Sequence, residues 1–180
     1  YTRRLIRRTD HWLVSRVFIG AEHAYGNSSE VPYSHQFYTG GANSIRAFTV
    51  RSIGPGSYRA PSELVNGYFD QTGTFKFEAN VEYRFPLFSI FHGALFVDAG
   101  NIWLLKDDPD RPGGQLKANT FLRDIALGTG LGLRLDLGMI VVRGDLGYGL
   151  HVPYDNGSQH YFNIPFKNAF AFHLAIGYPF

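Results

Sequence analysis

The stretch that decides the fold is Phe75-Lys76-Phe77-Glu78-Ala79-Asn80-Val81-Glu82-Tyr83-Arg84-Phe85. Every second residue, beginning with Phe75, is apolar or aromatic, and every residue in between carries a charge or an amide. Successive side chains of a β-strand point to opposite faces, whereas an α-helix would scatter these charges around its circumference. The stretch is therefore predicted to be a strand with one bulky apolar face and one polar face.

Five further segments alternate in the same way, namely residues 11–25, 91–103, 122–137, 139–150 and 167–180. In the last three segments the bulky residues alternate mainly with glycines, alanines and a few charges. Together with residues 75–85 they predict six strands of about 11 to 15 residues, long enough to cross a bilayer when tilted.

The connections between these segments alternate in length. Short turns are predicted near residues 86–89 and 137–138, and long loops at residues 26–73, 105–121 and 151–165. Short turns at one end and long loops at the other are typical of outer-membrane barrels. The sequence has no run of about 18 apolar residues, so no membrane-spanning helix is predicted.

Alternation alone does not tell which face meets lipid, because a soluble barrel or sandwich would turn the bulky face inward. Three features favour the membrane: glycines gather on the polar face, aromatic residues lie near strand ends, and the last residue is Phe180. We therefore expect an all-β, antiparallel transmembrane β-barrel. Glu78 and Arg134 are placed on the inner face, and Leu131 and Phe172 on the outer face.

Six strands are too few to close a bacterial barrel, whose smallest form has about eight. Either further strands lie in residues 1–10 and the first long loop, or the remaining strands are absent from this sequence. We favour the second interpretation.

Composition excludes several functional classes. The net charge is +2 with both signs balanced, so no clustered basic face predicts nucleic acid as a partner. The short basic run Arg3, Arg4, Arg7 and Arg8 is interpreted as a turn or membrane-edge cluster. Cysteine is absent and the seven histidines show no metal-ligand spacing, so neither a thiolate nor a histidine metal site is predicted.

Catalytic motifs are weak. Ser89 lies in a short turn without a glycine-flanked nucleophile elbow, and the glycines of residues 128–132 lie within a strand. The acidic run at residues 107–110 is interpreted as a solvated turn and not as a calcium site. We expect no enzyme activity and no cofactor.

Two motifs suggest a family. The first long loop contains Phe37-Tyr38-Thr39-Gly40-Gly41-Ala42-Asn43-Ser44-Ile45-Arg46-Ala47-Phe48, and a later strand reads Phe96-Val97-Asp98-Ala99-Gly100-Asn101-Ile102-Trp103. They resemble the loop and the Phe-x-Asp-x-Gly strand of the BamA/TamA superfamily of outer-membrane assembly factors, also called the bacterial surface antigen family. The family's Arg-Gly-Phe-like tripeptide is Arg-Ala-Phe here. Residues 130–134 and 143–148 resemble its next two strands, and Phe180 resembles its C-terminal aromatic signal.

The resemblance implies that residues 1–180 are the C-terminal part of an outer-membrane β-barrel, comprising the last six of about 16 strands, with a long loop of the family type at residues 26–73. It implies the cell outer membrane of a Gram-negative bacterium as the location. The implied function is assembly or insertion of outer-membrane proteins, with outer-membrane lipid, unfolded outer-membrane protein clients and accessory assembly subunits as partners. A passive pore or a two-partner secretion channel is the alternative.

In the family, the long loop folds back into the barrel, and its arginine pairs with the acidic residue of the strand. Carried onto this sequence, the loop-to-barrel anchor comprises Arg46, Phe48, Asp98, Gly40, Gly41, Phe96 and Gly100. Gly100 is expected to leave room for the approaching side chain. The C-terminal strand signal comprises Phe180 and Tyr178.

The alternative is that Arg46 and Asp98 are unrelated polar residues. The remaining inner charges are expected to form cross-strand networks: Glu78, Glu82, Arg134, Asp136, Arg143 and Asp145.

Overall fold

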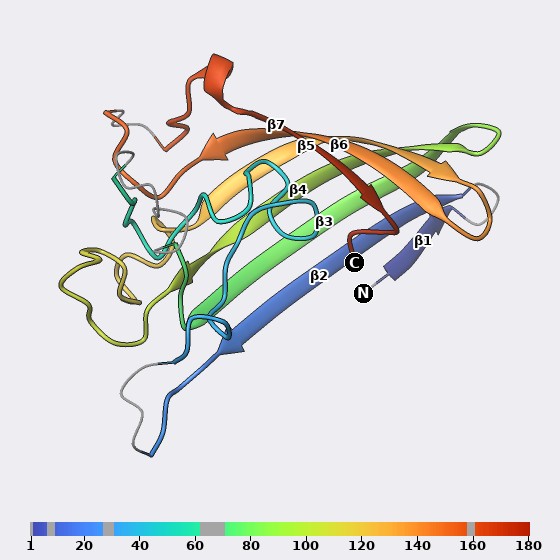
Figure 1. Cartoon of the computed structure of the whole chain (residues 1–180). Coiled ribbons are helices and arrows are strands. Elements are labelled where there is room, and N and C mark those ends of the chain that lie inside the picture. Colours follow the sequence, from blue (N-terminus) through green and yellow to red (C-terminus); the bar gives the residue numbers. More distant parts are fainter. Residues whose placement is uncertain (1, 7–9, 27–30, 62–70, 158–160) are drawn as a thin grey trace.

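A computed structural model describes residues 2–6, 10–26, 31–61, 71–157 and 161–180. It contains one antiparallel sheet of seven strands, paired in chain order from β1 to β7 (Figure 1). The strands are β1 Thr2–Ile6, β2 His11–Ala21, β3 Phe75–Phe88, β4 Phe91–Trp103, β5 Ala126–Asp136, β6 Val141–His151 and β7 Phe170–Ile176, with a 3-10 turn η1 at Phe166–Asn168. Within the described ranges, no helix has the length and apolar character to span a bilayer. The all-β antiparallel prediction is confirmed.

Strand β1 was not among the six predicted strands. It pairs with β2, with Thr2 opposite Val14, so residues 1–10 do hold a further strand. Its sequence Thr-Arg-Arg-Leu-Ile has no period of two, and the strand is specified by its hydrogen bonds to β2 instead. Of the basic run, Arg7 and Arg8 lie outside the described residues.

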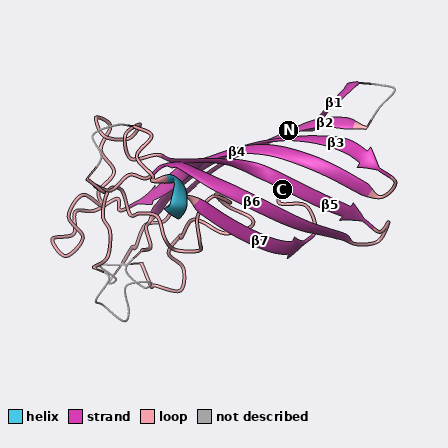
Figure 2. Cartoon of the chain, turned by 90° about the horizontal axis from the view of Figure 1, so that it is seen from above, coloured by secondary structure: helices cyan, strands magenta, loops and turns pink. Residues whose placement is uncertain are grey.

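The loops and turns lie at opposite ends of the sheet. Figure 2 shows the long loops gathered at one end and the tight β3–β4 and β5–β6 turns at the other. The register between β3 and β4 is continuous from Phe75 opposite Trp103 to Pro86 opposite His92. Each bulky row therefore continues from one strand to the next on the same face.

The two faces of the sheet have the predicted contents. Leu131 and Phe172 are 60% and 68% exposed, whereas Glu78 and Arg134 are 2% and 0% exposed. We call the first the outward face and the second the polar face. The outward face presents a contiguous apolar surface, as expected for a barrel wall in hydrocarbon.

The last residues differ from the prediction, which continued the outward row of β7 through Tyr178 to Phe180. Strand β7 ends at Ile176, and Gly177 adopts φ +89°, a conformation that favours glycine. The chain then turns onto the polar face, where the Phe180 ring lies 5.3 Å from the Arg16 guanidinium carbon and Tyr178 lies 4.3 Å from that of Arg84. Attraction between guanidinium groups and aromatic faces stabilises this turn.

Candidate functional site

The first long loop folds back and lies directly on strands β5 and β6. A Cβ atom added to Gly147 would meet the Arg46 carbonyl and would lie 2.6 Å from the Ala47 Cα. A Cβ at Gly128 would meet the Ala47 side chain. Glycines on the polar face therefore leave the space that the loop backbone occupies.

Arg46 is the centre of the contact. Its side chain and that of Asp98 are fully buried. The Arg46 Nε donates to Asp98 Oδ2 at 2.8 Å, Nη2 donates to Oδ1 at 2.9 Å, and the Arg46 backbone N–H donates to Oδ2 at 3.0 Å. The guanidinium fork thus meets the carboxylate through two parallel charge-assisted bonds. The structure brings together the two residues whose pairing the family resemblance implied.

The pair is one part of a network across four strands. Glu82 on β3 accepts hydrogen bonds from Arg46 and, at 3.1 Å, from Arg134 Nη2 on β5. Arg134 Nη1 donates to Asp145 on β6 at 2.6 Å, and Arg143 Nη1 donates to the other oxygen of Asp145 at 2.6 Å. These residues form the cross-strand network that the polar rows predicted. Asp136, grouped with them in the sequence, instead accepts the backbone N–H of Gly138 in the β5–β6 turn.

A second contact holds the loop at Ala42 and Asn43, which the sequence analysis missed. Arg143 donates to the Ala42 carbonyl at 2.9 Å and to the Asn43 side chain, while Arg16 donates to the Asn43 carbonyl at 3.1 Å. The two arginines lie on polar rows, so their inward direction was predictable. The contacts of Asn43 were not predictable, because an irregular loop has no periodicity from which to infer the direction of its side chains.

A third contact involves Glu78 on β3. Its carboxylate accepts hydrogen bonds from Thr39 Oγ1 at 2.9 Å and from the Ser44 hydroxyl. Beside it, the Asn80 amide donates to the Ser44 carbonyl and to Asp98, both at 2.9 Å. The inward direction of Glu78 was predicted, but the loop residues that bind it were not predicted.

The other predicted anchor residues have different roles. Gly40 and Gly41 have φ values of +89° and +95° and shape the loop. The Gly40 N–H donates to Ser44 Oγ at 3.0 Å, and the Gly41 N–H donates to the Phe48 carbonyl at 2.8 Å. The centroid of the Phe96 ring lies 3.7 Å from the Arg46 guanidinium carbon, so the guanidinium group packs on the face of the ring. Gly100 was expected to leave room for Arg46, but the space beside it is taken by strand β3. A Cβ there would lie 2.9 Å from the Glu78 Cα, so its close neighbour is the backbone of β3.

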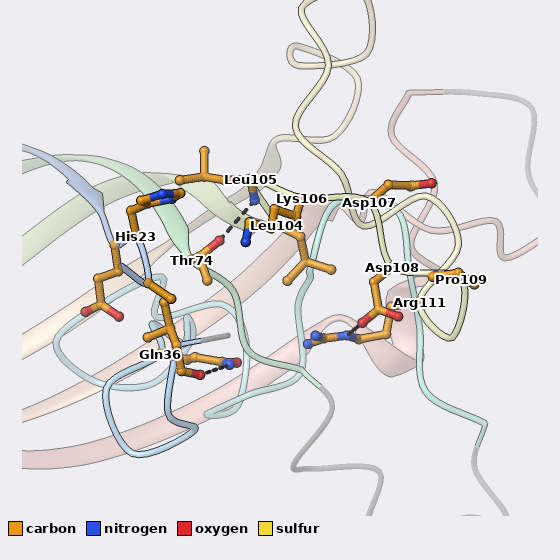
Figure 3. Close-up of a pocket in the computed structure, with 13 residues that line it drawn as sticks. His23, Gln36, Thr74, Leu104, Leu105, Lys106, Asp107, Asp108, Pro109 and Arg111 are labelled. Carbon is orange, nitrogen blue, oxygen red and sulfur yellow. Dashed lines mark hydrogen bonds and ion pairs between the residues drawn. The ribbon is translucent and has the colours of Figure 1, made fainter. Parts of the chain in front are cut away.

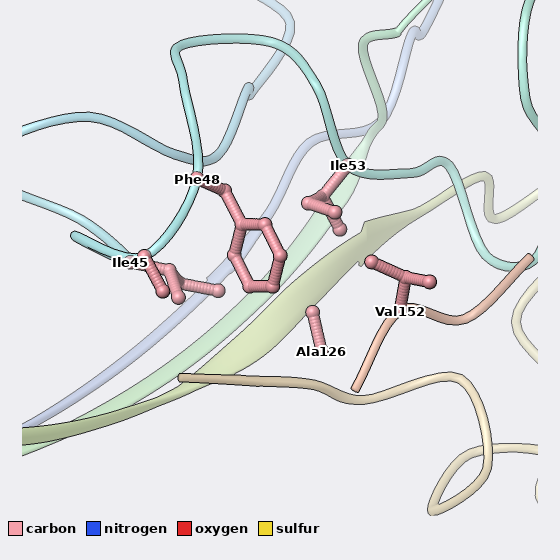
Figure 4. Packing of buried hydrophobic residues seen from close by; sticks show 6 residues of the cluster. Ile45, Phe48, Ile53, Ala126 and Val152 are labelled. Atoms are coloured by element: carbon pink, nitrogen blue, oxygen red, sulfur yellow. The ribbon is translucent and has the colours of Figure 1, made fainter. Parts of the chain in front are cut away.

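Phe48 contributes an apolar core to the docked loop. It is 8% exposed and belongs to a cluster in which the loop packs against strand β5 and the segment after β6 (Figure 4). The members of the cluster are Ile45, Ala47, Phe48, Ile53, Ala126 and Val152. The loop is therefore held by buried apolar area as well as by charge.

A pocket of about 330 Å³ lies among the long loops (Figure 3). At its edge Arg111 Nε donates to Asp108 at 2.7 Å, and the Asp110 N–H donates to Asp108 at 3.0 Å, which makes the acidic run a turn. The hydrogen bond from Arg111 lowers the pKa of Asp108. The contribution of this pair to stability is therefore present above the ordinary aspartate pKa and is lost as the pH falls through the lowered value.

No group of three or more acidic, histidine or cysteine residues in the described part of the chain is arranged to hold a metal ion.

The comparison with protein families decides the identity. Residues 5–180 match the Omp85 superfamily domain. The chain belongs to the Omp85 superfamily. This confirms the resemblance drawn from the loop and strand motifs, and it places the chain in the outer membrane of a Gram-negative bacterium as part of the wall of a β-barrel.

Similar proteins include the outer membrane protein assembly factor BamA of Neisseria meningitidis serogroup B, 29% identical over 90 residues. That match covers 47% of this chain and 11% of the relative. Among solved structures, BamA from Haemophilus ducreyi lacking POTRA domains 1–3 superposes with a TM-score of 0.64 at 19% identity, covering 97% of this chain and 33% of that one. This Omp85 chain therefore spans a minor part of either relative.

The Glu78 contact leads to a first prediction. Glu78→Gln keeps the size of the side chain but removes a charge that accepts from Thr39 and Ser44 and is paired with Arg16 and Lys76, both at 3.0 Å. We expect it to weaken docking of residues 39–44 by about 1.5–3 kcal/mol. Backbone hydrogen exchange of that segment in the intact protein should accelerate about tenfold or more. Asp136→Asn is the matched control, since Asp136 binds only its own turn in the contacts described above. Unchanged exchange in Glu78→Gln would show that this contact does not hold the loop.

Proposed function

We propose that this chain is the C-terminal barrel part of a factor that inserts or assembles outer-membrane proteins. The observation that carries the proposal is the short edge strand β7. It pairs with β6 over seven residues, from Val142 opposite Ile176 to Tyr148 opposite Phe170. The interior strand β3 is twice as long, with 14 residues. A β7 seam therefore has fewer ladder hydrogen bonds to break.

The mechanism follows from strand pairing. An unfolded client segment adds to the exposed edge of β7 by β-augmentation, so that its backbone hydrogen bonds replace those of a weak seam. The tail after Ile176 supports this, because it turns away onto the polar face and does not extend the edge. Client proteins, surrounding lipid and accessory assembly subunits are the partners of this proposal.

Site-specific photo-crosslinking tests this mechanism. A photoreactive amino acid is placed in the intact protein at Leu174 on β7, and at Val81 on the interior strand β3 as a control, since both side chains are exposed on the outward face. We expect adducts with newly made outer-membrane proteins at Leu174 and background adducts at Val81. Equal yields at the two positions, or none at Leu174, would remove the proposed mechanism.

The docked loop argues against the alternative of a passive pore or a two-partner secretion channel. Its contacts with Arg143, Asp98 and Glu78 cover the polar face along which a solute would pass. Liposomes separate the two functions: ion flux without client insertion favours the channel, and client insertion without matching flux favours the assembly factor. We also infer that the chain is not an enzyme. Lipid hydrolysis by the protein in the same liposomes, if substitution of Ser89 or His92 abolished it, would refute that inference.

A further inference from the structure

The outward face carries a hollow that has no part in loop docking. It has a volume of about 640 Å³, is open on its outward side, and crosses the sheet from β3 to β7. Its walls are two neighbouring rows of the sheet: Thr129 lies opposite Tyr148 in one row, and Leu131 lies opposite Leu146 in the next. We call it the outer hollow.

One small side chain opens the outer hollow. Of the residues of its row that line the hollow, Thr129 has the smallest side chain, while the Cβ direction of the adjacent Gly130 faces Phe96 on the polar face. One end is closed by the rings of Tyr148, Phe166 and Phe170, whose centroids lie 5.1–5.8 Å apart. The result is an open groove in the outward face that ends at these rings.

The lining favours an apolar occupant, because its only polar side chains are those of Tyr83, Thr129 and Tyr148. No lining side chain is charged. The Thr129 hydroxyl donates to the Phe96 carbonyl at 2.8 Å, and the Tyr83 hydroxyl is hydrogen-bonded to His11 Nδ1 at 2.6 Å. With these hydroxyls already paired inside the protein, a hydrocarbon occupant leaves neither of them without a partner.

We propose that the outer hollow seats one acyl chain of an outer-membrane lipid. Its walls belong to the same outward face as Leu131, which is 60% exposed, so the groove opens into the hydrocarbon that surrounds the barrel. Its volume falls within the range of about 300–1,000 Å³ that is usual for ligand sites. A flexible alkyl chain gains dispersion contacts in the groove that it lacks against a flat row. The proposal depends on the orientation of the sheet and not on the proposed assembly activity.

Photoreactive lipids test the site in the intact protein. One set of vesicles contains phosphatidylethanolamine, and another contains lipid A, each with a diazirine midway along an acyl chain. We expect crosslinks at Leu131 about fivefold above those at Val17 on β2, a difference typical of a modest binding preference. Val17 is 67% exposed on the same face but outside the outer hollow, so exposure alone predicts slightly more labelling there. Excess labelling in either set supports the site and identifies the lipid class.

Two substitutions separate the groove from ordinary surrounding lipid. Thr129→Leu fills the hollow and should abolish the excess at Leu131, whereas Thr129→Val keeps the size of the side chain and should retain it. Val97→Phe fills the same hollow from β4 and serves as a second variant; heat-modifiable gel migration checks that each variant is folded. Equal labelling of Leu131 and Val17, an excess that survives both filling variants, or protein adducts at Leu131 in native membranes in place of lipid would overturn the proposal.

Discussion

Replacing Arg46 with alanine is expected to release the long loop from the polar face and to destabilise the docked state by about 3–5 kcal/mol. The reason is that Arg46, Glu82 and Asp98 are all fully buried. Removing the cation deprives Asp98 of the two hydrogen bonds from the Arg46 guanidinium group, and it deprives Glu82 of one. Hydrogen exchange of residues 39–53 in the intact protein should then accelerate by about two to four orders of magnitude.

Two further variants show which property of Arg46 matters. Arg46→Lys keeps the charge but cannot form the fork with Asp98, so we expect an intermediate effect. The double variant Arg46→Ala/Asp98→Asn removes the unpaired carboxylate as well, and its effect should be smaller than the sum of the two single effects. Additive effects, or full protection in Arg46→Ala, would show that the pair does not anchor the loop.

The alternation of residues 75–85 was sufficient to separate the two faces of the strand, because a one-residue change of register would exchange them. Burial of Glu78 and exposure of Val81 followed once the glycines on the polar face, the aromatic residues near strand ends and Phe180 indicated which face is outward. The same reasoning placed Asp98 and Arg143 on the polar face. For these residues the direction of the side chain is a local property of the strand.

The contacts of the loop were less predictable. The bonds from Arg143 to Ala42 and Asn43 join segments about 100 residues apart in the chain, and an irregular backbone does not determine where its side chains point. Arg46 was the exception, because a family motif identified it. Strand β1 and the turn at Gly177 were missed for a related reason: each depends on partners on another strand and not on a repeating pattern.

Gly147→Ala is expected to displace the loop while every charge of the anchor remains. The new Cβ would meet the Arg46 carbonyl and the Ala47 Cα, which are backbone atoms that no rotation of a side chain can move away. Overpacking of this kind costs about 1–3 kcal/mol. Protection of residues 39–53 from hydrogen exchange should fall, and Gly147→Leu should lower it further.

The control for this prediction lies on the same strand. A Cβ at Gly144 would have the Phe172 ring carbons as its nearest neighbours at 3.6 Å, an ordinary contact, so Gly144→Ala should leave the loop docked. Both substitutions change a β6 glycine to alanine, so their difference isolates the contact with the loop backbone from the general effect on the strand. Equal exchange in the two variants would mean that charge alone positions Arg46. A loss confined to Gly147→Ala would mean that the fork reaches Asp98 only because the sheet leaves room for the loop backbone at this glycine.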